Sequence, residues 1–236
     1  MTPGRLFVVP SLLGIVAPET ALPARTIAVA RSLGHYVVEN AKPARAFLKT
    51  LAPDSPLREL RIAELGESPS PARCAELLAP ALSGHDMGLL SDAGCPGIAD
   101  PGALLVAQAH LEAIAVVPLV GPSAILLALM ASGMNGQAFA FHGYLPVDAG
   151  KRAQAIMRIE ADSVRSGYAQ LFIETPYRNV AMLGALVATC RPATRLCVAV
   201  DLTTENESVV SRPVGDWKGI EPGRYAKRPA IFALQG

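Results

Sequence analysis

Ser91-Asp92-Ala93-Gly94-Cys95-Pro96-Gly97-Ile98-Ala99-Asp100-Pro101-Gly102 follows directly on a short apolar run in which a buried strand is predicted. Small residues dominate the segment, and Pro101 suits the first position of a following helix. Open α/β sheets bind their ligands at the carboxyl ends of the strands. Glycine and alanine let backbone groups approach a ligand closely there, and Asp92 and Asp100 can accept hydrogen bonds from hydroxyl or amino groups. The segment therefore predicts a loop that holds a nucleotide-like ligand.

Two nucleotide-binding patterns are absent from this loop. It has no G-x-G-x-x-G fingerprint, and no Gly-Lys-Ser follows it as in a phosphate-binding P-loop. The alternative for Asp92 and Asp100 is that each caps a helix or fixes a turn. A second loop of small residues, Val120 to Ala124, follows the next predicted strand and places the Ser123 hydroxyl at the start of a helix. Two such loops on neighbouring strands are expected to face one crevice.

The first half of the chain alternates short β-branched runs with helical patterns, which is typical of βαβ units and a mostly parallel sheet. Strands are predicted at Leu6 to Val9, Tyr36 to Glu39, Met87 to Ser91 and Ile114 to Val120. Helices are predicted near Glu19 to Ser32, Ala44 to Leu51, Pro71 to Leu82, Pro101 to Ala109 and Pro122 to Ser132. The proline-rich stretch from Ala52 to Ser70 is expected to be a surface connection with at most one short strand.

The second half begins after a turn at Gly133 to Gly136, so the predicted domains are 1–133 and 134–236. Its predicted elements are an aromatic strand at Phe139 to Tyr144, a helix at Asp148 to Asp162, a strand at Gln170 to Glu174, a helix at Arg178 to Thr189, and strands at Arg195 to Leu202, Glu207 to Val214 and Pro229 to Leu234. Short turns between the late strands favour an antiparallel contribution and a mixed sheet. The fold class predicted is α/β with two domains.

The composition indicates a compact globular protein. Of 236 residues, 51% are hydrophobic and 17% are charged, which excludes a disordered chain. The net charge of +1 gives no global field toward nucleic acid and leaves the substrate open. The four cysteines form no C-x-x-C pair and have no histidine at ligand spacing, so no metal site is expected. We expect them to be reduced thiols of a cytoplasmic protein.

Two apolar segments imitate targeting signals. Arg5 and the run Leu6 to Ala17 resemble a weak signal peptide, but Pro10 and Gly14 interrupt the run and favour a buried first strand. The stretch Ala113 to Val147 carries no Asp, Glu, Lys or Arg, and a membrane span is its alternative reading. Prolines and glycine divide its most apolar part into pieces too short to cross a bilayer, so a strand and a buried helix are predicted, with no membrane partner.

Five ordered blocks resemble the S-adenosylmethionine (SAM) dependent tetrapyrrole methylase superfamily, and most closely its branch of small-subunit ribosomal RNA 2′-O-ribose methyltransferases. That branch carries S-D-A-G-T-P-x-x-x-D-P-G, P-G-P-S/C-A, S-G, G-F-L-P and Y-E-S-x-H-R in this order. The matching stretches are Ser91 to Gly102, Val120 to Ala124, Ser132-Gly133, Gly143 to Pro146, and Ile173 to Arg178.

The resemblance implies a methyltransferase, usually a homodimer, with SAM in a cleft between the two domains and S-adenosylhomocysteine (SAH) as the product. The implied cofactor contacts are Pro10, Asp92, Gly94, Cys95, Ile98, Asp100, Ser123, Ala124, Ile173, Glu174, Val200, Pro229 and Ala230. If the acceptor is a hydroxyl, a general base is useful, and Glu174 is the candidate catalytic residue. The alternative is that Glu174 forms a structural ion pair with Arg178, four residues later.

The chain departs from the branch at three places that bear on the acceptor. In this chain, Pro10 to Val16 replaces the P-T-P-I-G-N-L of the branch, and Glu39 to Lys42 replaces its E-D-T-R. The segment Val200 to Glu207 replaces R-E-L-T-K-x-x-E, with loss of an arginine and a lysine. RNA is the predicted acceptor, at a ribose or another nucleotide position. A tetrapyrrole or protein substrate, or a SAM-binding protein without catalysis, are the alternatives.

Overall fold

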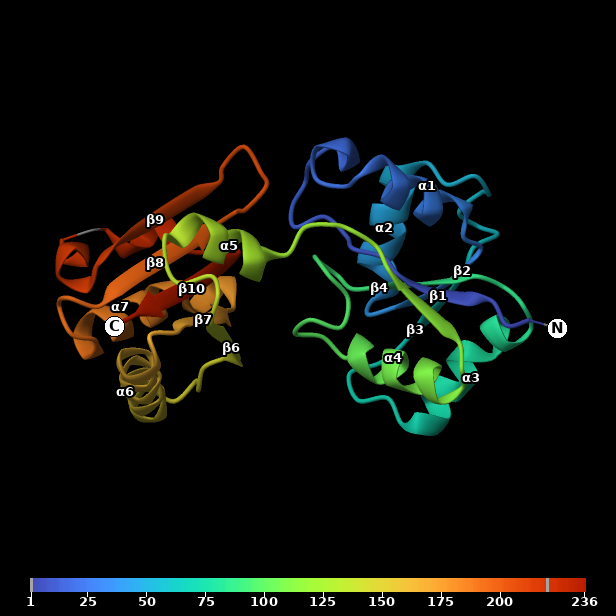
Figure 1. Ribbon diagram of the computed structural model, residues 1–236. Helices are drawn as coiled ribbons and strands as arrows, with labels where there is room; N and C mark the ends of the chain where they lie inside the picture. The colour runs from blue at the N-terminus through green and yellow to red at the C-terminus, as the bar shows by residue number, and fades with distance from the viewer. Residues whose placement is uncertain (1, 220) are drawn as a thin grey trace. The chain divides into compact units, whose positions relative to one another are not determined.

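The computed structural model describes residues 2–219 and 221–236, and the chain divides into two compact units after Ser123. The N-terminal unit holds a five-stranded sheet in the order β3-β2-β4-β1-β5 (Figure 1). Its strands are β1 Arg5–Val8, β2 His35–Val38, β3 Arg61–Glu64, β4 Met87–Leu90 and β5 Ala115–Pro118. Every pairing in this sheet is parallel. Central β4 is buried along its whole length, as expected for a strand covered on both faces.

Four α-helices cover the two faces of this sheet. They are α1 Ala24–Ser32, α2 Ala41–Leu51, α3 Pro71–Leu82 and α4 Gly102–Leu111, and a short 3-10 turn, Pro18–Thr20, precedes α1. In Figure 1, α1 and α2 lie on one side of the strands and α3 and α4 lie on the other. Two hydrophobic clusters reflect this division: Leu78 and Leu105 pack with Leu89 on one face, and Leu48 packs with Val38 on the other.

The C-terminal unit contains a second five-stranded sheet in the order β6-β7-β10-β8-β9. Its strands are β6 Phe139–Tyr144, β7 Ala169–Glu174, β8 Arg195–Val200, β9 Ser208–Pro213 and β10 Ala230–Gln235. The β6–β7 pairing is parallel, whereas β10 is antiparallel to both β7 and β8. The prediction of one parallel and one mixed sheet is therefore confirmed.

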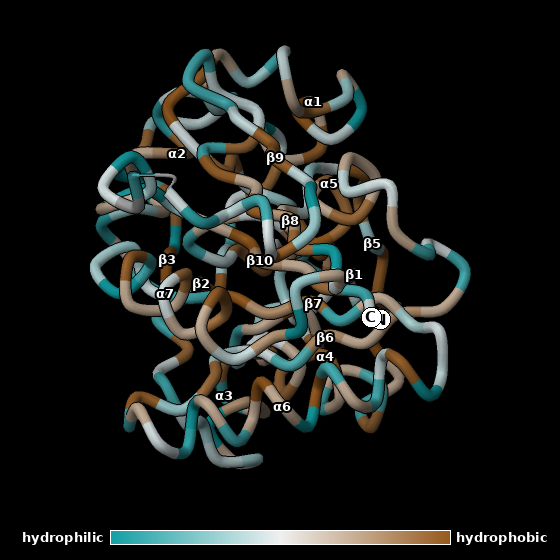
Figure 2. The backbone as a smooth tube through the Cα atoms, turned by 90° about the vertical axis from the view of Figure 1, so that its left-hand side faces the viewer, coloured by the Kyte–Doolittle hydropathy of each residue, from teal (hydrophilic) through white to brown (hydrophobic). Residues whose placement is uncertain are grey.

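The helices of the C-terminal unit are α5 Ala124–Ser132, α6 Ala149–Ser166 and α7 Asn179–Thr189, with 3-10 turns at Pro176–Arg178, Val214–Trp217 and Pro222–Tyr225. The helix α6 is amphipathic, and in Figure 2 its backbone alternates between teal and brown. Its buried Ile156 and Ile159 pack with Leu183 of α7 and with Phe172 and Phe232, whose rings stack at 5.7 Å.

The division between the units falls after Ser123, whereas the sequence placed a domain boundary after Gly133. The difference is the helix α5, which packs against β7, β8, β9 and β10. Ala128 and Leu129 are buried, and the Ser132 carbonyl accepts a hydrogen bond from Ser211 Oγ of β9 at 2.7 Å. This helix therefore belongs with the second sheet, although only the short loop 119–123 separates it from the last strand of the first.

The segments that imitated targeting signals are regular elements. The first run forms β1, which pairs with β4 and with β5, and the charge-free stretch forms β5, α5 and β6. Within the part of the chain that the structure describes, no helix has the length and apolar character needed to cross a membrane. The buried residues of these stretches, such as Leu6, Ala128 and Leu129, lie in or against the two sheets.

Candidate functional site

The loops that follow β1, β4 and β5 lie along one edge of the N-terminal sheet. These three strands are adjacent and parallel, so their carboxyl ends meet at this edge. The ladder continues past the strand ends, since Val9 N donates to the Leu89 carbonyl at 2.9 Å and Leu119 N donates to the Val8 carbonyl at 3.0 Å. We call the residues at this edge, 9–16, 39–40, 91–102 and 119–123, the loop cluster.

The loop after β1 is bonded directly to the loop after β4. Ser11 N donates to the Gly94 carbonyl at 2.9 Å, and the buried Ser11 Oγ donates to the Ser91 carbonyl at 3.1 Å. Gly94 has a φ of +76°, in the left-handed region that glycine adopts without strain. The glycine that the sequence placed in the ligand loop thus lets that loop turn back toward β1.

The loop after β5 is held by a close approach. A Cβ on Gly121 would lie 2.3 Å from Pro10 Cβ, so only glycine fits against this proline. From the other side, Cys95 Sγ donates to the Pro122 carbonyl at 3.4 Å. Pro10 and Cys95, two predicted cofactor contacts, are therefore brought together through one loop of small residues.

The end of β2 adds two polar side chains to the loop cluster. Glu39 Oε2 accepts from Asp92 N at 3.1 Å, and Asn40 Nδ2 donates to Asp92 Oδ2 at 2.7 Å. Burial raises the pKa of the Glu39 carboxyl, and the charges of Asp92 and Asp100 raise it further against the opposing effect of the Asp92 N–H. Asp92 is thus fixed by its neighbours, as the turn-fixing alternative expected, while its negative charge remains uncompensated by any cation in the loop.

Asp100 has one satisfied oxygen and one unsatisfied oxygen. Its Oδ1 accepts from Gly97 N at 2.8 Å and from Gly102 N at 2.7 Å, which fixes the turn before α4. Its Oδ2 is buried and has no hydrogen-bond partner among the described residues. Burial raises the pKa of this carboxyl above its usual range. A buried acceptor without a donor is unfavourable, so Oδ2 is suited to a donor that a ligand supplies.

The C-terminal unit brings its own predicted contacts into one row. In the antiparallel ladders, Ala230 is opposite Glu174 on one side and Val200 on the other. Asp201 N donates to the Pro229 carbonyl at 3.0 Å, which closes the row. Ile173, Glu174, Val200, Pro229 and Ala230 are therefore neighbours at one edge of the second sheet, and we call them the edge row.

Glu174 is engaged by the arginine that follows it. Its side chain is 1% exposed, and Oε1 accepts from Arg178 Nη2 at 2.5 Å, from Arg178 Nε at 2.9 Å and from Thr175 N at 2.6 Å. This geometry favours the ion-pair alternative for Glu174. Its role as a general base stays a prediction.

Arg228 is a residue of the edge that the sequence did not single out. Its Nε donates to Asp201 Oδ2 at 2.6 Å, and its Nη2 donates to the Asn206 carbonyl at 2.5 Å. Asp201 has a φ of +50° and Thr203 one of +72°, so this guanidinium holds a turn of unusual backbone conformation. Arg228 is 27 residues from Asp201 in the sequence, so no local pattern links the two. Only the folding of the sheet brings them together.

The predicted contacts thus fall into two groups. Pro10, Asp92, Gly94, Cys95, Ile98, Asp100 and Ser123 belong to the N-terminal unit, and Ala124 opens α5 of the C-terminal unit, which also holds the edge row. Ile98 is 52% exposed at the surface of the loop cluster. Whether these residues contact the cofactor stays a prediction.

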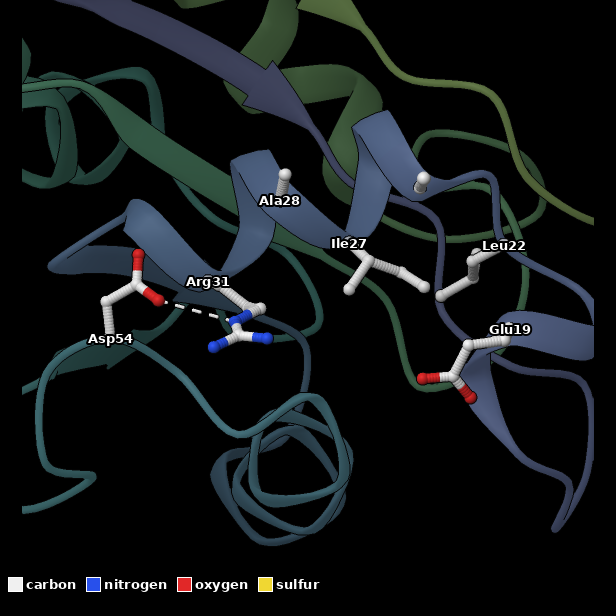
Figure 3. A pocket seen from close by; sticks show the side chains of 7 residues that line it. Glu19, Leu22, Ile27, Ala28, Arg31 and Asp54 are labelled. Atoms are coloured by element: carbon white, nitrogen blue, oxygen red, sulfur yellow. Dashed lines mark hydrogen bonds and ion pairs between the residues drawn. The ribbon is translucent and has the colours of Figure 1, made fainter.

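A separate hollow lies beside α1 and contains none of the predicted contacts. Figure 3 shows Leu22 and Ile27 at its lining, with Glu19 at one side and an ion pair at the other, in which Arg31 Nε lies 3.3 Å from Asp54 Oδ1. The ion pair is exposed on both sides, and such pairs contribute little to stability. We assign no function to this hollow.

Comparison with known proteins places the chain among methyltransferases. It is 30% identical over 213 residues to ribosomal RNA small subunit methyltransferase I of Escherichia coli O157:H7, a match over 90% of this chain and 70% of that protein. Proteins of the same name match from Micromonospora olivasterospora, at 34% identity over 86% of this chain and 61% of the relative, and from Mesorhizobium japonicum, at 37% over 57% and 44%. The matched stretches thus span 44 to 70% of these relatives' own lengths. No family model matches the chain.

Solved structures share the fold at low identity. The methyltransferase CobJ superposes with a TM-score of 0.64 at 17% identity, over 99% of this chain and 94% of its own. Uroporphyrin-III C-methyltransferase from Thermus thermophilus, solved with S-adenosylhomocysteine, superposes with a TM-score of 0.56 at 16% identity, over 98% and 97%.

These findings define the class: the chain is a methyltransferase with the two-unit fold of the tetrapyrrole methylases. Within that class it belongs to the family of ribosomal RNA small subunit methyltransferase I. The family predicted from the five ordered sequence blocks is confirmed.

Proposed function

We propose that the chain binds SAM at the loop cluster and transfers its methyl group to RNA, at a ribose 2′-hydroxyl. The observation that carries the proposal is the convergence of three strand-end loops at the segment that contains Asp100, whose buried Oδ2 has no donor among the described residues. The names of the relatives support RNA as the acceptor, and the fold neighbour solved with SAH supports the cofactor.

The residues of the loop cluster fit SAM chemically. Gly94 and Gly97 both have positive φ angles and carry no side chain, which suits the close approach of a nucleoside to this turn. Asp100 Oδ2 can accept from a ribose hydroxyl or an amino group. SAM supplies an activated methyl group with a neutral leaving group, so the chain's main task is to orient donor and acceptor.

The acidic character of the loop cluster also suits this cofactor. Glu39, Asp92 and Asp100 are bonded to backbone N–H groups or an amide, and none is in an ion pair of the described residues. A sulfonium and an ammonium group are both favoured beside uncompensated carboxylates. The same charges disfavour a phosphate at this position.

A ribose hydroxyl as acceptor benefits from a general base. Glu174 is the predicted candidate, but its Oε1 atom already accepts hydrogen bonds from the Arg178 guanidinium. Burial raises the pKa of Glu39, which gives this carboxylate a higher affinity for a proton. We propose Glu39 as a second candidate, to be separated from Glu174 by the pH dependence of methylation in Glu39→Gln and Glu174→Gln. The proposal also includes a homodimer in the cytoplasm, as the family resemblance implies.

Two measurements test the proposal. Calorimetric titration with SAM and SAH is expected to show binding of both, and absence of binding to either contradicts it. Tritiated methyl groups from SAM are then offered to RNA, protein and small-molecule fractions of cells that lack this gene. Label in RNA that resists alkali between adjacent nucleotides supports ribose 2′-O methylation. Label only in protein or tetrapyrrole, or in no fraction despite SAM binding, overturns the RNA assignment.

A further inference from the structure

The helix α2 carries three cations on one exposed stripe. Lys42, Arg45 and Lys49 are all exposed, and at 100° per residue their spacings of three and seven place them within an arc of roughly 60°. The opposite face buries Ala44, Leu48 and Leu51 against the sheet. The stripe therefore plays no part in packing, and we call these three residues the α2 stripe.

No carboxylate neutralises the α2 stripe among the ion pairs of the described residues. Some exposed arginines on other helices do have such partners. Arg73 of α3 lies 3.2 Å from Glu76, and Arg165 of α6 lies 2.6 Å from Asp162, each pair within one helical turn. Within the described part of the chain, Lys151 and Arg158 of α6 also lack an ion pair, but α2 differs in carrying three exposed cations and no acidic residue between Ala41 and Leu51.

The arrangement is unfavourable for the helix itself. Lys42 lies in the first turn, where the helix dipole disfavours a cation, and that turn contains no acidic residue. Lys42 and Arg45 are three apart and Arg45 and Lys49 are four apart, and like charges at these spacings repel each other. Glu64 Oε1 caps Ala41 N at this end, and the dipole favours Lys49 in the last turn, but neither removes the repulsion between neighbouring cations. That remaining repulsion points to a role of the stripe outside the helix.

The position of α2 connects the stripe with the proposed site. The helix begins at Ala41, directly after Asn40, whose side chain donates to Asp92 of the loop cluster. Lys42 is therefore within one turn of that cluster, and Lys49 follows about 10 Å further along the helix axis. The stripe leads away from an edge that is itself acidic.

We infer that the α2 stripe binds the phosphates of the RNA substrate next to the methylated nucleotide. This inference rests on the proposed function. The carboxylates Glu39, Asp92 and Asp100 repel phosphate but tolerate a neutral ribose, whereas the stripe attracts phosphate. Together the two surfaces orient the RNA, so that a ribose faces the loop cluster while the phosphodiester backbone lies along α2.

The test compares two triple variants that each remove three exposed, unpaired cations. Lys42→Gln/Arg45→Gln/Lys49→Gln removes the stripe, and Lys151→Gln/Arg158→Gln/Lys218→Gln removes matched charges from the C-terminal unit. Binding of a fluorescein-labelled 16-nucleotide single-stranded RNA of mixed sequence is measured by anisotropy from 50 to 300 mM KCl. SAM affinity is measured by calorimetry on the same preparations, and it reports whether each variant is folded.

The stripe variant is expected to bind the RNA at least tenfold more weakly at 100 mM KCl. Its plot of log affinity against log salt is expected to flatten by about 2, since each phosphate contact with a single strand contributes about 0.7. SAM affinity is expected to stay within twofold of the wild type, and the control variant to lose less than twofold in RNA affinity.

Two results overturn the inference in distinguishable ways. If the wild type binds and methylates RNA and the stripe variant keeps the same affinity and salt slope, the surface is wrong while the proposed function stands. If the wild type binds SAM but neither binds nor methylates RNA, the proposed function is wrong and the inference falls with it. Equal losses in the two triple variants also overturn it, because they indicate a general charge effect.

Discussion

The two sheet edges hold their carboxylates in different ways. At the loop cluster, Asp92 and Asp100 accept from an amide side chain and backbone N–H groups. At the C-terminal edge, Glu174 and Asp201 are each bonded to a guanidinium, that of Arg178 and that of Arg228. The hydrogen bonds at the loop cluster fix the carboxylates without neutralising their negative charge. The guanidinium groups at the C-terminal edge neutralise that charge.

This difference separates two functions of a buried carboxylate. A carboxylate bonded to N–H groups remains available to a cationic or hydroxyl-bearing ligand, whereas one bonded to arginine mainly fixes the backbone around it. The loop cluster is thus suited to bind, and the C-terminal edge is suited to keep its shape. Four substitutions test this contrast, from the largest expected effect to the smallest.

Removal of the guanidinium from the C-terminal edge is expected to have the largest effect. Arg178→Met leaves the Glu174 carboxylate buried without its cation, and loss of one partner of a buried pair lowers the free energy of unfolding by about 3 to 5 kcal/mol. Trp217 is the single tryptophan and is 2% exposed in this unit, so its fluorescence during urea unfolding reports the change. Arg165→Met, which breaks an exposed pair, is the control and is expected to change it by less than about 0.5 kcal/mol.

Crowding of the loop cluster is expected to rank second. Gly121→Ala places a Cβ 2.3 Å from Pro10 Cβ, so the backbone must shift, which destabilises by about 1 to 3 kcal/mol and displaces the loop that carries Ser123. Calorimetry is expected to show at least a tenfold loss of SAM affinity, with faster hydrogen exchange in β1. The control Gly184→Ala lies in α7 with no atom within 4 Å of the new Cβ, and it is expected to stabilise the helix. Unchanged SAM binding in Gly121→Ala contradicts the role of this loop.

Neutralisation of Asp100 is expected to distinguish cofactor from product. In Asp100→Asn the amide oxygen can still accept from Gly97 N and Gly102 N, but the charge and the free acceptor are lost. SAM affinity is expected to fall about tenfold, which is about 1.4 kcal/mol, and SAH affinity to fall less because it lacks the positive sulfonium. Asp148→Asn, a change at the N-cap of α6 that keeps a good capping residue, serves as the control. An equal loss for SAM and SAH would show that charge at this edge does not discriminate between them.

The smallest effect is expected in the pH dependence of stability. Burial raises the pKa of Glu39 above 4.5, so folding disfavours its charged form and wild-type stability falls as the pH rises from about 4.5 through the raised pKa. Glu39→Gln is expected to melt at a higher temperature than the wild type at pH 7, with the difference vanishing below about pH 4.5. Circular dichroism melts at pH 4 and pH 7 measure this. Exposed Glu205→Gln, with the same change of net charge, is expected to show no such trend.

Much of the fold could be predicted from local signals. The helix α3 has the predicted bounds, because Ser70 Oγ caps Arg73 N and Pro71 opens the first turn. The predicted start of α2 at Ala44 was three residues late, because Glu64 Oε1 accepts from Ala41 N at 2.7 Å. That cap comes from the end of β3, and no pattern within the helix reveals it.

The limits at the site have the same physical origin. The loop that is predicted to hold the ligand was chosen from its small residues and its strand-end position, both of which are local. Ser11 and Arg228 were missed because their partners, Gly94 and Asp201, lie far away in sequence and meet them only in the folded sheets. The division by contacts falls before the predicted boundary at Gly133 for a similar reason, since the contacts of α5 are with strands that come later in the chain.

The division of the chain after Ser123 has a consequence for biosynthesis. All five strands of the first sheet come from residues 5 to 118, and the chain passes from one unit to the other once. During translation the N-terminal unit can therefore fold before any strand of the second sheet has been made. The helix α5 is synthesised next, but its partners β7, β8, β9 and β10 all follow later in the chain, and β10 comes last. Until then the apolar face of α5 lacks the sheet on which it packs, and transiently exposed apolar surface of this kind is prone to aggregation during synthesis.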